Sequence, residues 1–137
     1  MNRFGRAIAQ VSLAAAVSLG AGAAQAQTYP TRNITVIVPF AAGGPTDVIA
    51  RIVTGQMAPG LRQSMIIENV VGAGGTTATT RVARAANDGY TLITGHMGTH
   101  AASVALYPKL AYHPEKDCEP IALLAGTPVL ILARKDF

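Results

Sequence analysis

Three histidines, at positions 96, 100 and 113, are the side chains of this sequence best suited to acid–base chemistry or metal binding. His96 and His100 are four residues apart, which on a helix would place both imidazoles on one face, as metal ligands can be. Gly95 and Gly98 favour a loop instead, and no glutamate lies near enough to complete a zinc-protease motif. A hydrolase would also need an activated nucleophile, and no G-x-S-x-G elbow occurs. The sequence predicts no metal and no cofactor, and a small exported hydrolase with a histidine base is the alternative.

Two glycine-rich stretches, AAGGPTD at 41–47 and GAGG at 72–75, are candidates for binding an anion through backbone N–H groups. A dinucleotide fingerprint starting at Gly72 would need glycine at position 77, where threonine stands, and neither stretch holds the lysine of a P-loop. Nucleotides are therefore disfavoured. A tight turn that binds nothing explains the first stretch equally simply. Threonine hydroxyls are expected to line a polar pocket: Thr46, Thr76, Thr77 and Thr99.

The first glycine stretch joins an expected strand to an expected helix. The run at 34–38 is β-branched, as in a strand buried on both faces, and Pro39 ends it because proline donates no N–H. We expect Gly43 and Gly44 to adopt backbone angles closed to other residues, and the helix to begin at Pro45. Asp47 then favours the helix N-terminus, and Arg51 points outward. A stripe should pack on the sheet: Val48, Ile49, Ile52, Val53 and Met57.

The remaining chain repeats the alternation of strand and helix. Residues 58–60 should end the first helix, and 108–120 read as an irregular surface connection. The further expected elements are strands at 64–69, 90–94, 121–124 and 129–133, a helix at 76–86, and a short helix reaching 106. This order predicts an α/β fold with a mostly parallel sheet and helical crossovers. Because parallel strands point the same way, the loops after the first three strands should converge on one edge.

Positions 1–26 have the features of a secretory signal. Arg3 and Arg6 precede an uncharged run, and Ala24, Gln25 and Ala26 form an A-x-A cleavage site. We expect cleavage after Ala26 and a mature protein that begins at Gln27. A membrane anchor is the alternative, because the uncharged run is long enough, but its many Ala, Gly and Ser residues favour a cleaved signal.

Composition sets further bounds on the mature chain. Removing 26 of 137 residues leaves 111, which is enough for one modest domain but not for two lobes. The formal charge of +4 falls to +2 without the signal, since nine Lys and Arg then face seven Asp and Glu, and no nucleic-acid patch is evident. Cys118 is the only cysteine, so no internal disulfide can form. It is expected to be a small buried residue, with a thiol-linked dimer as the alternative.

Several segments together resemble the Bug family, the periplasmic solute-binding proteins of tripartite tricarboxylate transporters. They are TYPTRNITVIVPFAAGGPTDVIAR, GAGGTT, AANDGYTLITGHMGTHAA and LYPKLAYHPEKDCEPIALLAGTPVLILA, and they span nearly all of 27–137. The resemblance implies one lobe of a fold similar to type II periplasmic binding proteins. It also implies periplasmic binding of a small carboxylated solute, without catalysis, for delivery to a membrane permease. An interaction protein that signals to a membrane partner is a further alternative.

The resemblance also implies where the ligand carboxylate binds, on three loops that correspond to those of the family. The implied binding residues are Phe40, Ala41, Gly43, Gly44, Thr46, Gly74, Gly75, Gly95, Gly98, Thr99 and His100. Asp47 matches an acid of the first loop that is expected to be structural.

The sequence departs from the family pattern at several positions and in length. Val70 and Val71 stand where Arg-Pro is usual, and Thr76, Thr77 and Ala78 stand where Asn-Ile-Gly is common. His113 and Cys118 replace a frequent Asp and a frequent Phe. Family members continue for roughly another lobe and a half. We therefore expect 27–137 to be a truncated first lobe, lacking the second lobe and the return segment, with impaired binding.

Overall fold

The computed structural model describes residues 28–126 and 132–136, and within them three parallel strands form one sheet in the order β2-β1-β3. The strands are Ile34–Val38 (β1), Met65–Asn69 (β2) and Thr91–Ile93 (β3). In the register, Val38 lies opposite Asn69, and Thr35 lies opposite both Ile66 and Thr91. The predicted α/β fold with a parallel sheet and helical crossovers is confirmed.

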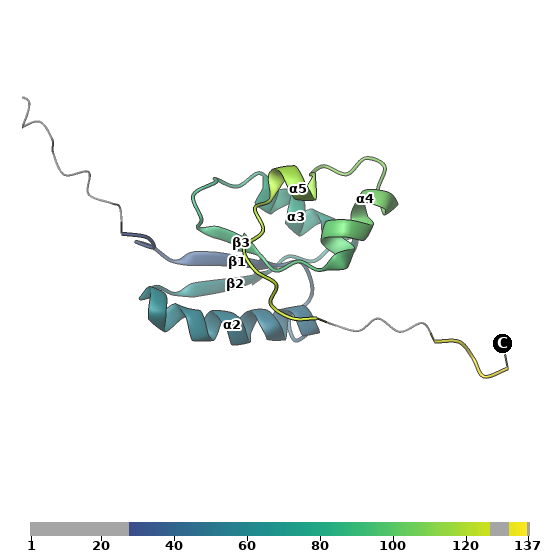
Figure 1. Cartoon of the computed structure of the whole chain (residues 1–137), viewed down its shortest axis with the longest axis horizontal. Coiled ribbons are helices and arrows are strands. Elements are labelled where there is room, and N and C mark those ends of the chain that lie inside the picture. Colours follow the sequence, from purple (N-terminus) through teal and green to yellow (C-terminus); the bar gives the residue numbers. More distant parts are fainter. Residues whose placement is uncertain (1–27, 127–131, 137) are drawn as a thin grey trace, which may run out of the picture.

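Helices cover both faces of this sheet (Figure 1). Helix α2 (Pro45–Leu61) lies along one face, while α3 (Thr76–Ala83), α4 (Ser103–Leu106) and α5 (Pro114–Asp117) lie on the other. Two shorter turns complete the order: a 3₁₀ turn, η1 (Ala73–Gly75), precedes α3, and a π-helical turn, η2 (Gly98–Ala102), leads into α4. Strand order 2-1-3 begins the doubly wound arrangement in which ligands bind beyond the carboxyl ends of β1 and β3.

The core is centred on β1, the middle strand. Ile34, Val36, Ile37 and Val38 are each at most 2% exposed, because neighbours cover this strand on both edges and both faces. Pro39, which follows the strand, is also buried. The interpretation of the run at 34–38 as a strand buried on both faces is therefore correct.

The predicted sheet-facing stripe of α2 is wrong at three of its five positions, while Ile49 and Val53 are partly buried. Val48, Ile52 and Met57 are 45%, 62% and 43% exposed, whereas the residues of α2 that the sheet buries are Asp47, Ala50 and Thr54. Successive residues are about 100° apart around a helix, so the buried face is displaced by about one position from the most apolar stripe. Small side chains allow the helix to approach the sheet closely, and polar contacts of Asp47, described below, set its rotation.

Several predicted boundaries also need correction. Helix α2 does not end at 58–60 but continues through Pro59 and Gly60 to Leu61, and it is capped by Arg62, whose φ of 54° is left-handed. Helix α3 ends at Ala83 instead of position 86. The connection at 108–120 contains α5 and the buried Tyr112, so it is not wholly irregular surface.

The two strands predicted at 121–124 and 129–133 are not found in the described residues. Residues 121–124 form no strand and are exposed, with Leu123 at 91%. Of the strand expected at 129–133, residues 129–131 lie outside the described residues, and so does the signal at 1–26. Among the helices of the described ranges, none is long and apolar enough to span a membrane.

Candidate functional site

The loops after the three strands meet at Gly75. This glycine is buried, with a φ of +91°, and a methyl group on its α-carbon would lie 2.5 Å from Thr99 Cγ2, 3.1 Å from Pro39 Cβ and 3.5 Å from Phe40 Cζ. Pro39 and Phe40 follow β1, Gly75 follows β2 and Thr99 follows β3. The predicted convergence of the three loops at the carboxyl edge of the sheet is therefore present in the structure.

The first loop presents the start of α2 at this edge. Gly43 has a φ of +82°, and its N–H donates to Asp47 Oδ2 at 2.8 Å. Gly44 was expected to adopt backbone angles closed to other residues, and this is wrong, because its φ of −74° and ψ of 166° suit any residue. The first backbone bond of α2 runs from Val48 N–H to the Gly44 carbonyl at 2.9 Å. The N–H groups of Thr46 and Asp47 precede that bond, and a helix N-terminus offers N–H groups in these positions to an anion.

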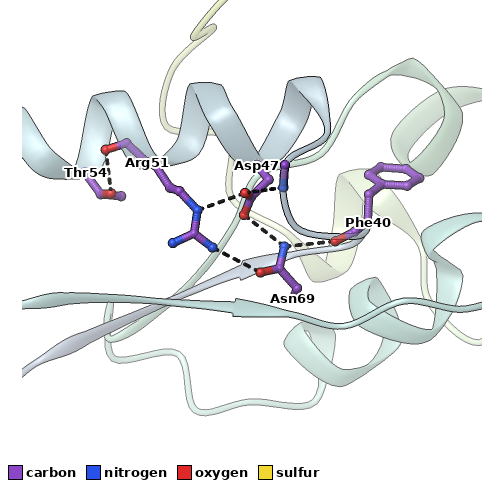
Figure 2. A network of polar contacts seen from close by, with 6 residues as sticks. Phe40, Asp47, Arg51, Thr54 and Asn69 are labelled. Carbon is purple, nitrogen blue, oxygen red and sulfur yellow. Dashed lines mark hydrogen bonds and ion pairs between the residues drawn. The ribbon is translucent and has the colours of Figure 1, made fainter.

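Asp47 is the centre of a polar network beneath this loop (Figure 2). Its side chain is 1% exposed, and its carboxylate accepts hydrogen bonds from Gly43 N–H, Arg51 Nε at 2.8 Å and Asn69 Nδ2 at 2.9 Å. The bonds from Arg51, Gly43 and Asn69 hold the pKa of Asp47 well below its usual range. Arg51, predicted to point outward, is half exposed, yet its guanidinium turns back to Asp47. The geometry gives Asp47 a structural role, as expected.

The third loop is more helical than the sequence suggests. Gly98, Thr99 and His100 lie in η2 and not in an open loop. The Thr99 side chain is fully buried, and its hydroxyl accepts from His96 N–H at 3.0 Å and lies 2.7 Å from His100 Nδ1. The structure therefore turns this side chain inward, to support the loop instead of lining a pocket. Partial burial lowers the pKa of His100, and the charge of His96 acts in the same direction.

Glycines in this loop make room for histidine rings. A methyl group on Gly95 would lie 2.0 Å from His100 Cε1, and one on Gly98 would lie 2.6 Å from His96 Cε1. His96 Nδ1 accepts the Gly98 N–H at 2.7 Å. These two glycines are thus required for packing, which the sequence alone could not distinguish from ligand approach.

One aromatic contact joins the first and third loops across the sheet edge. The rings of Phe40 and His96 stack with centroids 4.6 Å apart and planes 10° from parallel. Because Phe40 follows β1 and His96 follows β3, this pair lies between the two strands where doubly wound sheets bind ligands.

The second loop turns through left-handed backbone angles, which are strained for Ala73 but not for its glycines. Ala73 and Gly74 have φ values of 45° and 63°, and a methyl group on Gly74 would lie 3.0 Å from the hydroxyl of Tyr107. Thr76 donates its hydroxyl to the Ala73 carbonyl at 2.9 Å, which closes the turn. Gly74 and Gly75 therefore support the shape of this loop.

Within the three loops, charged side chains are absent from the segments that directly follow the strands. Positions 39–44, 70–75 and 94–97 contain no Lys, Arg, Asp or Glu. Any anion at this edge would meet N–H groups, hydroxyls and imidazoles instead of a dedicated cation. In the part of the chain that the structure describes, no group of three or more His, Cys, Asp or Glu side chains could hold a metal ion.

Sequence reasoning overlooked two supporting residues. Asn69, the last residue of β2, bonds both Asp47 and the Phe40 carbonyl, and Tyr112 donates its hydroxyl to the Thr99 carbonyl. Asp47 and Arg51 at i and i+4 gave a local signal for their ion pair. Asn69 and Tyr112 gave none, because their partners are distant in sequence.

Sheet order, convergent loops and a helix N-terminus at the carboxyl edge define a binding lobe of the α/β class. A family model described as "Tripartite tricarboxylate transporter family receptor" matches residues 49–137. The chain belongs to this family, which is a solute-binding receptor family of the Bug type and not an enzyme family. The histidine-base hydrolase is therefore not supported.

Individual relatives agree with this assignment. An Agrobacterium vitis UPF0065 protein, from the TAR-I ttuE-ttuC' intergenic region, is 46% identical over 114 residues, covering 82% of this chain and 33% of that protein. MatC from Rhodopseudomonas palustris, solved with bound malate, is 64% identical with a TM-score of 0.68, covering 70% of this chain and 33% of MatC. The periplasmic binding protein BugD is 46% identical with a TM-score of 0.65, covering 68% and 31%. The chain thus spans about one third of the length of these relatives.

Proposed function

We propose that this chain is exported to the periplasm and binds one carboxylate group of a small organic acid at the carboxyl edge of its sheet. The first loop forms one side of the site through Phe40, Ala41, Gly43, Gly44 and Thr46, which either contact the carboxylate or shape the loop that does. Gly74 and Gly75 of the second loop, and Gly95, Gly98, Thr99 and His100 of the third, shape the rest of the site. The bound acid is then delivered to the membrane permease of a tripartite tricarboxylate-type transporter.

The observation that carries this proposal is the meeting of the three loops at Gly75, on the same sheet edge as the start of α2, whose first backbone bond begins only at Val48 N–H. A carboxylate accepts hydrogen bonds from such N–H groups, and the helix dipole favours its negative charge. Since Arg51 already pairs with Asp47, the attraction comes from neutral donors. Gly43 N–H is also engaged by Asp47, so we assign it to loop shape and Thr46 N–H to the ligand.

The relatives support the class of ligand. MatC, the most similar of the solved relatives described above, was solved with malate, a dicarboxylate. Loops of one lobe contact a ligand from one side only. Each hydrogen bond then competes with water, and a few such bonds must offset the lost freedom of the ligand. We expect millimolar affinity for residues 27–137 alone.

A matched pair of substitutions at Ala42, an exposed residue of the first loop, tests the proposal. Malate is titrated into the purified chain and followed by NMR chemical shifts. Ala42→Asp should weaken binding about tenfold or more, because it adds a like charge within a few ångströms of the ligand carboxylate. Ala42→Asn has nearly the same shape without the charge and should change affinity less than about threefold. No shifts with malate, or equal losses in both variants, would reject the site.

Export is tested separately. We expect the periplasmic protein to begin at Gln27, because Ala24 and Ala26 supply the small residues that signal peptidase requires. Intact-mass measurement of periplasmic extract decides this, and a protein that retains Met1 and sediments with membranes contradicts it.

A further inference from the structure

Asn69 stands where the first and second loops begin. It is the last residue of β2 and lies opposite Val38, the last residue of β1. Its side chain therefore lies beside the point at which the chain leaves β1 to form the first loop. Figure 2 shows it between Phe40, Asp47 and Arg51.

The side-chain amide of Asn69 forms hydrogen bonds through both its nitrogen and its oxygen. Its nitrogen donates to the Phe40 carbonyl and to Asp47 Oδ1, both at 2.9 Å, and its oxygen accepts from Arg51 Nη2 at 3.2 Å. Rotating the amide by 180° would place its oxygen against a carbonyl and a carboxylate, both of which only accept hydrogen bonds. The surroundings therefore specify one orientation and specify an amide over a carboxylate.

The two acceptors of Asn69 lie at opposite ends of the first loop. Phe40 is at its start, while Asp47 is in the first turn of α2 and also accepts the N–H of Gly43. One amide thus closes the loop from 40 to 47 across its base. Phe40 in turn stacks on His96, so the position of its backbone also affects the third loop.

We propose that Asn69 is a positioning residue for the carboxylate site: it holds the first loop in the conformation that presents the N–H groups at the start of α2. This inference rests on the proposed function. Asn69 touches no ligand in this scheme and acts through Phe40 and Asp47.

Glu68 provides a matched control on the same strand. Its carboxylate pairs with Arg81 of α3, which lies on the opposite face of the sheet from α2 (Figure 1). Glu68→Gln therefore weakens a surface ion pair of β2 without changing the contacts of Asn69.

The experiment compares Asn69→Ala, Asn69→Asp and Glu68→Gln in the purified chain. Amide hydrogen exchange of Gly43 without ligand reports the loop, and malate titration by NMR reports the site. Both Asn69 variants should speed Gly43 exchange and weaken malate binding by about tenfold or more, since each leaves hydrogen-bonding groups without this partner. Asn69→Asp should be the worse, because its carboxylate faces that of Asp47. Glu68→Gln should change either value less than about twofold.

A rescue separates positioning from general destabilisation. Combining Asn69→Asp with Asp47→Asn returns an amide donor opposite the carboxylate, and Gly43 exchange should recover in part. Unchanged Gly43 exchange in the Asn69 variants, or faster exchange with unchanged malate affinity, overturns the inference. If the unmodified chain binds no malate, the proposed function fails, and Gly43 exchange still decides whether Asn69 holds the loop.

Discussion

Replacing Gly75 by alanine tests how tightly the three loops are packed. The new methyl group would lie 2.5 Å from Thr99 Cγ2 and 3.1 Å from Pro39 Cβ, whereas carbon atoms in contact are 3.5–4.0 Å apart. The φ of +91° is also unfavourable for alanine, by roughly 1–2 kcal/mol. Overpacking costs roughly 1–3 kcal/mol, and the stiffer unfolded chain returns up to about 1 kcal/mol. We expect a net loss of about 2–4 kcal/mol in the free energy of unfolding.

Gly43→Ala is the control for the backbone part of this loss. Gly43 has a similar φ of +82°, but nothing lies within 4 Å of the added methyl group, so a loss of about 1 kcal/mol is expected. Urea unfolding followed by circular dichroism measures both variants, and Thr99→Ser in the Gly75→Ala background should restore part of the loss by removing Cγ2. Equal costs at positions 43 and 75, or no effect of Thr99→Ser, would refute the close packing of the loops.

Three further outcomes follow from individual residues. Gly55→Ala, in the interior of α2 with nothing within 4 Å of the new methyl group, should stabilise the chain by about 0.5–1 kcal/mol in the same urea assay. Ile52→Ser should change stability by less than about 0.5 kcal/mol, because this side chain is 62% exposed; a loss like that of a core residue would show that another surface covers α2. Asp47 has a lowered pKa in the folded state, so its contribution is complete above the unfolded value of about 3.9 and is lost as pH falls below it. The difference in urea midpoint between the unmodified chain and Asp47→Asn should therefore stay constant from pH 7 to about pH 5 and shrink as pH falls below about 4; a difference that is still unchanged at about pH 3 would contradict this.

Much of the fold follows from patterns that are local in sequence. The β-branched run at 34–38 predicted the central strand, and the glycines after each strand predicted where the chain turns. Pro45 marked the first residue of α2, since proline suits the first helical position. Parallel order then required the loops to share one edge, so convergence was predictable without any knowledge of distances.

The rotation of α2 was not predictable in this way. Counting apolar side chains favours the stripe with Ile52, yet the sheet buries Ala50 and Thr54, which are smaller and permit a closer approach. The buried Asp47 fixes that rotation through Asn69, which is 22 residues away. A hydrophobic pattern contains no information about such a bond. The roles of the glycines were ambiguous for the same reason, because Gly95 is needed for the ring of His100 and not for an unusual φ.

The charges near the first loop lead to a consistent view of recognition. Asp47 and Arg51 neutralise each other and are both held by Asn69, so neither is free to attract or repel a ligand strongly. The partial positive charge of the α2 N-terminus then remains as the main attraction, and it acts only within about one turn of the helix end. Recognition by short-range, oriented N–H groups depends on their placement more than on net charge. If the proposed site is correct, substitutions of the residues that place these groups, Asn69 beneath the loop and Gly75 beside it, should lower affinity although neither side chain is assigned a ligand contact.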